Sequence, residues 1–206
     1  MAPGRSTEPE DPTGLLLARY GGTLLRVARC AIAHGLAHGR RLDIDPLSYA
    51  PELRDKRATF VTLELAGKLR GCIGKSVACN PLVSDIAENA YAAAFKDGRF
   101  EALTEAEADN ADIKLSVLSD LEPLTFADEP DLVARLRPGT DGVMIEHGSN
   151  RGLFLPDVWD KVADPRGFLD QLKTKAGLPA GFWSDEIAAY RFTTASTSLS
   201  RRADAA

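Results

Sequence analysis

The sequence contains few cysteines and no long apolar run, and each shortage excludes a class of protein. Its 206 residues include three cysteines, Cys30, Cys72 and Cys79, which are an odd and widely spaced set. Such a set suits a reducing compartment and argues against a disulfide framework. No apolar stretch reaches membrane-spanning length, and the first residues are polar and acidic, unlike a secretion signal. We therefore expect a cytoplasmic protein with no membrane partner.

The chain also lacks an excess of positive charge. Its formal net charge is -5, and its aromatic residues are not interleaved with basic ones. Nucleic-acid-binding domains normally carry a basic excess, so we expect no nucleic-acid partner. The apolar fraction of 44% and the charged fraction of 27% are ordinary for a soluble globular protein. A chain of this length suits one domain, or one domain with a minor lobe.

The common cofactor and metal motifs are missing as well. The sequence has no GxGxxG, GxxxxGK[ST], HExxH, GxSxG or CxxxCxxC pattern, so we expect no cofactor. His34 and His38 lie four residues apart, a spacing that can bind zinc on a helix. No third ligand is in register with them, and Arg40 and Arg41 follow directly. We therefore interpret both histidines as solvated side chains and expect no metal site.

The spacing of apolar residues predicts an α+β fold with an antiparallel sheet flanked by helices, because strands occur in hairpin-like pairs among segregated helices. Residues 1–12 are predicted to be a disordered tail, and residues 195–206 a polar C-terminal tail. Between them lies one domain, residues 13–194. The predicted helices cover residues 13–38, 81–97, 131–137 and 165–176, with Asn80 as the cap of the second. The predicted strands cover residues 58–65, 69–74, 113–118, 143–147, 152–155 and 187–194.

The stretch from Leu69 to Gly74 carries the strongest chemical signal. On a strand, Arg70 and Cys72 share one face, about 6.5 Å apart at the backbone. A nearby guanidinium favours the thiolate, which is the reactive form of cysteine. The alternative is that Cys72 is a small buried hydrophobic residue without reactivity. The flanking Gly71 and Gly74 weaken a strand, so we expect a ligand or another backbone to approach closely there.

The same stretch, Leu69-Arg70-Gly71-Cys72-Ile73-Gly74, resembles the signature of the AMMECR domain family, whose bacterial members are called AmmeMemoRadiSam system protein A. Further segments resemble the family in the same order, so the likeness extends from about Gly14 to Thr194. They are residues 57–63, residues 81–100 including Asp97-Gly98-Arg99-Phe100, residues 136–142, residues 151–159 and residues 175–179.

This resemblance implies a larger sheet-and-helix lobe, a smaller lobe and a cleft between them with the motif at its wall. It also implies that Asp97 and Arg99 line the pocket near Cys72. One hypothesis is an enzyme, or an enzyme component, that acts on a small molecule with Cys72 as thiolate and Arg70 as its cation. In that hypothesis Gly71, Gly74, Asp97 and Arg99 contact the substrate. The other hypothesis is a non-catalytic binding or scaffold module for Memo-like and radical SAM proteins, as the system name implies.

A general base for the enzyme hypothesis stays open. His147 titrates near neutral pH and lies at the end of a predicted strand, but a structural role beside the following turn is the simpler interpretation. Glu64 and Glu88 are the alternative proton carriers.

Overall fold

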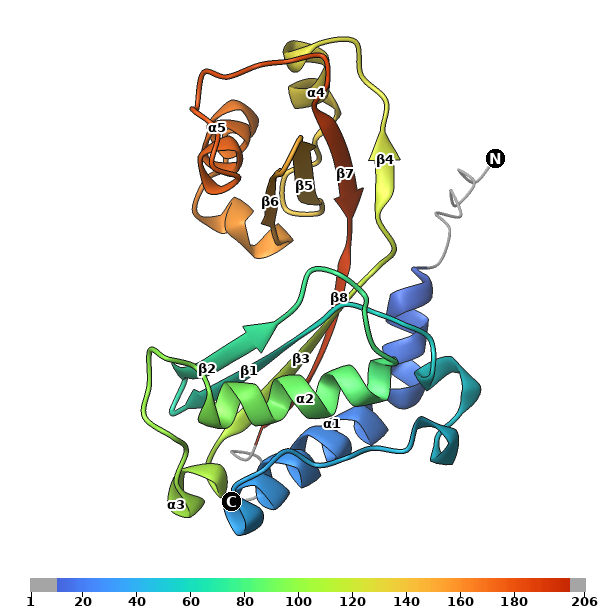
Figure 1. Cartoon of the computed structure of the whole chain (residues 1–206), viewed down its shortest axis with the longest axis vertical. Helices are drawn as coiled ribbons and strands as arrows, with labels where there is room; N and C mark the ends of the chain where they lie inside the picture. Colours follow the sequence, from blue (N-terminus) through green and yellow to red (C-terminus); the bar gives the residue numbers. More distant parts are fainter. Residues whose placement is uncertain (1–10, 201–206) are drawn as a thin grey trace, which may run out of the picture. The chain divides into compact units, whose positions relative to one another are not determined.

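The computed structural model describes residues 11–200, which form two compact units (Figure 1). One unit takes the chain up to Leu118 together with the stretch from Ala195, and the other is Ser119–Thr194. Each unit combines helices with an antiparallel sheet, so the predicted α+β class is confirmed. The cleft that we expected between two lobes stays a prediction.

The larger unit is built on a four-stranded sheet with the order β2-β1-β3-β8. The central β1 pairs antiparallel with β2 on one side and with β3 on the other. Its alternate residues Val61 and Leu63 are buried, as the period of two predicts. The strands are β1 (Thr59–Leu65), β2 (Lys68–Gly74), β3 (Asp112–Leu118) and β8 (Thr194–Leu199).

Two long helices pack against each other and against this sheet (Figure 1). They bury an apolar core that includes Leu24 and Ile32 of the first helix and Ile86 and Ala90 of the second. Asp11 begins the first helix by accepting hydrogen bonds from the backbone N–H groups of Thr13 and Gly14. The helices of this unit are α1 (Pro12–His38), α2 (Leu82–Phe95), the short α3 (Glu105–Ala108) and two 3-10 helices, η1 (Pro46–Ser48) and η2 (Pro51–Leu53).

A two-residue turn joins β1 to β2. Ala66 and Gly67 both have positive φ, 52° and 75°, which is the turn that matches the twist of a hairpin. The pairing register then shifts, because Leu63 pairs with Gly71 whereas Glu64 pairs with Leu69. Arg70 is the extra residue of this bulge, so the period of two is interrupted there.

The start of α2 differs from the prediction. Pro81, not Asn80, is the residue that precedes the helix, and it makes no side-chain capping bond. Asn80 instead donates a hydrogen bond from Nδ2 to Glu88, eight residues later in the chain, at 3.0 Å. A partner within the tertiary structure therefore replaces the local cap that the dipeptide Asn-Pro predicted.

The smaller unit carries the second sheet, with the order β4-β7-β5-β6 and antiparallel pairing throughout. Its core stacks the Trp159 and Phe168 rings with centroids 3.7 Å apart. Its strands are β4 (Glu122–Leu124), β5 (Gly142–His147), β6 (Asn150–Phe154) and β7 (Ala188–Phe192), and its helices are α4 (Glu129–Arg135), η3 (Pro156–Asp160) and α5 (Pro165–Lys175).

The predicted polar tail at residues 195–206 is wrong in its first part. Residues 194–199 form β8, which lies beside β3, and the hydroxyls of Ser116 and Ser196 are 2.9 Å apart. Only Ala195 and Leu199 of this strand are apolar, and both pack against the core of the larger unit, an alternation too sparse to predict a strand from the sequence. Residues 201–206, like residues 1–10 of the predicted N-terminal tail, lie outside the described residues. None of the helices within residues 11–200 combines the length and apolarity that a bilayer-spanning segment requires.

Candidate functional site

The two glycines of the motif have a packing reason within the protein itself. A Cβ added to Gly71 would overlap the backbone carbonyl of Ala93 on α2. A Cβ added to Gly74 would overlap the Phe60 ring and the carbonyl oxygen of Thr59. The close approach that we expected is therefore made by neighbouring protein atoms. A ligand contact at either glycine stays a prediction.

Cys72 lies between these glycines and is partly exposed. It pairs across the sheet with Thr62 of β1, and the Thr62 hydroxyl donates a hydrogen bond to the Cys72 sulfur at 3.3 Å. Sequence reasoning missed Thr62. The signal for it was present, because the hairpin register places the two residues opposite each other once the turn is known.

The backbone of Cys72 is held from the outside of the sheet. Because β2 is an edge strand, its outward N–H and C=O groups have no neighbouring strand. The Asp97 carboxylate accepts the Cys72 N–H at 2.9 Å, and the Arg99 guanidinium donates to the Cys72 carbonyl at 3.2 Å. These two side chains stand where an adjacent strand would stand.

Asp97 and Arg99 also bond to each other. Arg99 donates to both oxygens of the Asp97 carboxylate, at 2.9 and 2.6 Å. These bonds, together with the Cys72 N–H, hold the pKa of Asp97 well below its usual range, although burial opposes the shift. Asp97 and Arg99 therefore lie beside Cys72, and the expectation that they line a pocket and contact a substrate stays a prediction. Their contacts are with the backbone of Cys72.

Arg70 is engaged with α3. Its guanidinium donates to both oxygens of Glu107, at 2.9 and 3.1 Å, and to the carbonyl of Ala102 at 3.4 Å. These bonds lower the pKa of Glu107 to about 2. Glu107 also closes a capping box with Thr104, a Thr-x-x-Glu pattern that sequence reasoning overlooked. Of the described residues, Glu107 and not Cys72 is the partner of the Arg70 charge.

The histidines make contacts of their own. His147 belongs to the smaller unit, where its ring contacts Phe182 at 5.0 Å and its Nε2 lies 3.8 Å from Glu186. The rings of His34 and His38 are 4.4 Å apart on α1. Within residues 11–200 there is no group of three histidine, cysteine or carboxylate side chains placed to hold a metal ion.

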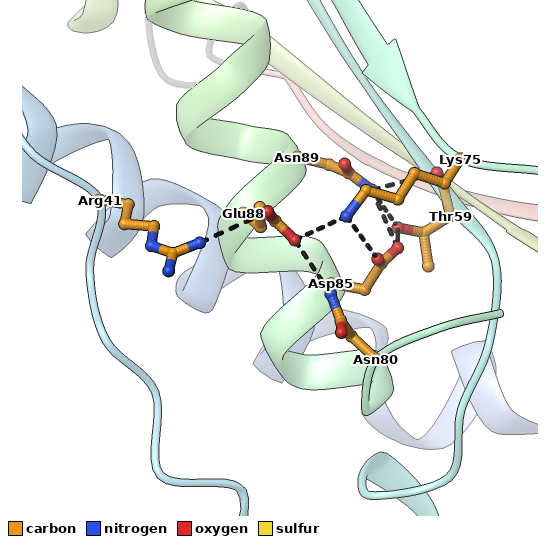
Figure 2. A network of polar contacts seen from close by, with 7 residues as sticks. All are labelled: Arg41, Thr59, Lys75, Asn80, Asp85, Glu88 and Asn89. Atoms are coloured by element: carbon orange, nitrogen blue, oxygen red, sulfur yellow. Dashed lines mark hydrogen bonds and ion pairs between the residues drawn. The ribbon is translucent and has the colours of Figure 1, made fainter. Parts of the chain in front are cut away.

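A second polar region begins where β2 ends, and sequence reasoning missed most of it (Figure 2). The Asp85 side chain of α2 is fully buried, and its Oδ2 accepts from the Thr59 hydroxyl at 2.6 Å and from Asn89 Nδ2 at 2.9 Å. Its Oδ1 has no hydrogen-bond partner among the described residues. Lys75 Nζ lies 4.0 Å from that oxygen. Burial raises the pKa of Asp85, although the Thr59 hydrogen bond opposes the shift.

Lys75 connects this buried carboxyl to Glu88. Its Nζ donates to Glu88 Oε2 at 2.7 Å, a bond that raises the pKa of Lys75. Asn80 donates to the same oxygen, and Arg41 lies 3.5 Å from Oε1. The signal in the sequence was the spacing of Asp85, Glu88 and Asn89, three polar residues at i, i+3 and i+4 on a helix whose other buried residues are apolar.

A family model, curated proteins and a solved structure each match most of this chain. The AMMECR1 family model matches residues 25–197. A protein of Methanothermobacter thermautotrophicus is 39% identical over 174 residues, which cover 84% of this chain and 90% of that protein. A protein of Thermofilum pendens is 37% identical, covering 87% of this chain and 89% of that one. The crystal structure of the uncharacterized protein PH0010 from Pyrococcus horikoshii matches with a TM-score of 0.76 and 33% identity, over 87% of this chain and 91% of that one.

Proposed function

The chain belongs to the AMMECR1 family, and we propose that it is an enzyme, or a component of one, that acts on a small molecule through the thiolate of Cys72. The observation that supports this proposal most is the hydrogen bond from the Thr62 hydroxyl to the Cys72 sulfur. A donor aimed at sulfur favours the negatively charged form, which is the nucleophile. Cys72 is also partly exposed, as a residue that contacts a substrate must be.

In this proposal Arg99 is the cation beside Cys72. It reaches the Cys72 carbonyl, and its Asp97 partner holds the Cys72 N–H. Both bonds fix the backbone from which the thiol projects, so Asp97 and Arg99 act as positioning residues. Arg70, which the sequence favoured for this role, orders α3 through Glu107.

The second candidate is a non-catalytic scaffold module. It is favoured by the fact that the charges around the motif are already paired, Arg99 with Asp97 and Arg70 with Glu107. A region with satisfied charges needs no small ligand and can serve as a rigid surface. Memo-like and radical SAM proteins are the partners proposed for such a module, and the small-molecule proposal needs neither.

The three cysteines allow an internal test in the unmodified chain. Cys30 and Cys79 are exposed, whereas Cys72 is only partly exposed. If accessibility alone set the rate, iodoacetamide at pH 7 would modify Cys72 last. If the enzyme proposal is correct, we expect the modification rate of Cys72 to exceed those of Cys30 and Cys79 by about tenfold or more. Peptide mass spectrometry follows the modification of each cysteine. Slower modification of Cys72 than of both exposed cysteines would favour the scaffold module.

A further inference from the structure

A cavity of about 250 Å³ lies beside the second polar region, between the segment that follows α1 and the beginning of α2. Its walls include the polar residues Arg41, Asp43, Asn80, Ser84 and Glu88. The volume is somewhat below the range of pockets for drug-sized ligands, so it suits a smaller molecule.

One charged wall of this cavity is positive. The Arg41 side chain is 70% exposed, and its described contact is the 3.5 Å approach to Glu88 Oε1. Such an exposed pair contributes little stability, so a ligand can replace it at small cost. A guanidinium presents a planar set of donors that matches a carboxylate.

The other charged wall is negative. Lys75 and Asn80 both bond to Glu88 Oε2, which fixes the carboxylate and leaves Oε1 with the loose Arg41 contact. Asp43 has no hydrogen bond or ion pair within the described part of the chain, and it is exposed. Two residues with carboxylate groups, Asp43 and Glu88, thus line the cavity and have acceptor capacity left, which suits an ammonium group.

The remaining walls are apolar. Leu42 and Ile44 pack against the core of the larger unit, and Pro46 and Pro81 complete the lining. The charged residues of the lining are one cation, Arg41, and two carboxylates, Asp43 and Glu88, while Lys75 pairs with Glu88 from outside the lining and also lies 4.0 Å from Asp85. A ligand with charge of one sign would meet only one kind of these groups, whereas a zwitterion meets both.

We propose that this cavity binds a small aliphatic amino acid as its zwitterion. The ligand carboxylate pairs with Arg41, its ammonium lies against Glu88 Oε1 and Asp43, and its aliphatic side chain lies on Leu42 and Ile44. Lys75, held over the buried Asp85, keeps Glu88 in place and acts as a positioning residue. The site requires no reaction at Cys72, so it stands independently of the proposed function.

The test is isothermal titration calorimetry of the full chain with L-leucine, L-valine and L-alanine, each up to about 10 mM. Two matched probes each remove one charge from leucine: 4-methylpentanoate lacks the ammonium and isopentylamine lacks the carboxylate. We expect at least one amino acid to bind. If leucine binds, each single-charge probe should bind about tenfold more weakly or worse, because each loses a charge-assisted contact.

The variant Arg41→Met should weaken the binding of the amino acid by about tenfold. Arg19→Met is the matched control, because Arg19 is 71% exposed and also pairs with a single glutamate, Glu52. It should leave binding unchanged. Thermal unfolding of both variants, monitored by circular dichroism, checks that the fold is retained.

Three results would overturn the proposal: no binding by any of the three amino acids, equal binding by a single-charge probe, or equal effects of the two arginine variants. Alkylation of Cys72 with iodoacetamide beforehand, in a chain where Cys30 and Cys79 are serine, separates the two sites, because Cys79 is exposed and adjoins Asn80 of the cavity. Amino-acid binding should survive it, whatever the role of Cys72.

Discussion

The two polar regions at β2 shift the pKa values of their carboxyl groups in opposite directions. Around Cys72, the carboxylates of Asp97 and Glu107 each accept hydrogen bonds from an arginine and from backbone N–H groups, and these bonds lower the pKa of each. At the end of the strand, Asp85 is buried with one oxygen unpartnered and an ammonium 4.0 Å away, and its pKa is raised. In the first region both carboxylates have partners on each oxygen, and the buried atom without a hydrogen-bond partner among the described residues is Arg70 Nη1; in the second region it is an oxygen of the carboxyl group itself.

This difference shows how the polar groups of each region are compensated within the protein. Near Cys72, side chains replace a missing neighbouring strand, so the backbone N–H and C=O groups of Cys72 have partners within the protein. At Asp85, burial removes a carboxyl group from water, and hydrogen bonds to only one of its two oxygens offset the cost of desolvation. The following changes should break or sharpen this contrast.

The largest expected effect is at Gly71. Gly71→Ala places a Cβ against the Ala93 carbonyl, which is helix backbone and cannot move without shifting α2. We expect a loss of about 3 kcal/mol in the free energy of unfolding, as in severe overpacking. Gly98→Ala is the control, because open space surrounds that glycine and its φ is not positive. Urea denaturation of both variants measures the difference, and equal stabilities would remove the packing explanation of the motif glycine.

The next effect is at Asp97. Asp97→Ala removes the acceptor of the Cys72 N–H and the partner of Arg99, and we expect a loss of about 2 kcal/mol. Asp131→Ala is a matched change, because Asp131 also accepts a backbone N–H and pairs with Arg135. The Asp97 side chain is 5% exposed and that of Asp131 31%, so the control should lose less than about 1 kcal/mol. A control as damaging as Asp97→Ala would contradict the role of burial.

The pH dependence of stability should differ in sign between the two regions. The raised pKa of Asp85 means that the unfolded chain releases this proton first, so its contribution falls as pH rises above about 4. The lowered pKa of Glu107 gives the opposite: its contribution is complete above about 4.5 and is lost as pH falls toward 2. The relevant measurement is the free energy of unfolding from pH 3 to pH 7 for Asp85→Asn and Glu107→Gln.

Relative to the wild type, Asp85→Asn should gain stability as pH rises across that window, and Glu107→Gln should lose it. Differences that change in the same direction for both variants would show that the two carboxylates do not contrast as described.

Much of the fold follows from local patterns, and most of the site does not. The hairpin around Ala66–Gly67 and the helix from Pro12 are set by spacing and turn residues near in sequence. The bulge at Arg70 depends on how β2 pairs with β1, which the spacing of residues does not reveal. The prediction that Arg70 and Cys72 share one strand face assumed a regular strand and could not take the bulge into account. Glu107, the partner of Arg70, is 37 residues away. β8 was missed because its two apolar residues, Ala195 and Leu199, give too sparse an alternation to predict a strand without β3 beside it.

The reactivity of Cys72 tests the account most directly, in a chain where Cys30 and Cys79 are serine. Arg99→Met leaves the Asp97 carboxylate uncompensated beside Cys72 and should slow alkylation at pH 7 by about fivefold. Arg70→Met removes a charge that is paired with Glu107 and should change the rate by less than about twofold. A rate that falls more with Arg70→Met than with Arg99→Met, or that neither variant changes, would contradict the account.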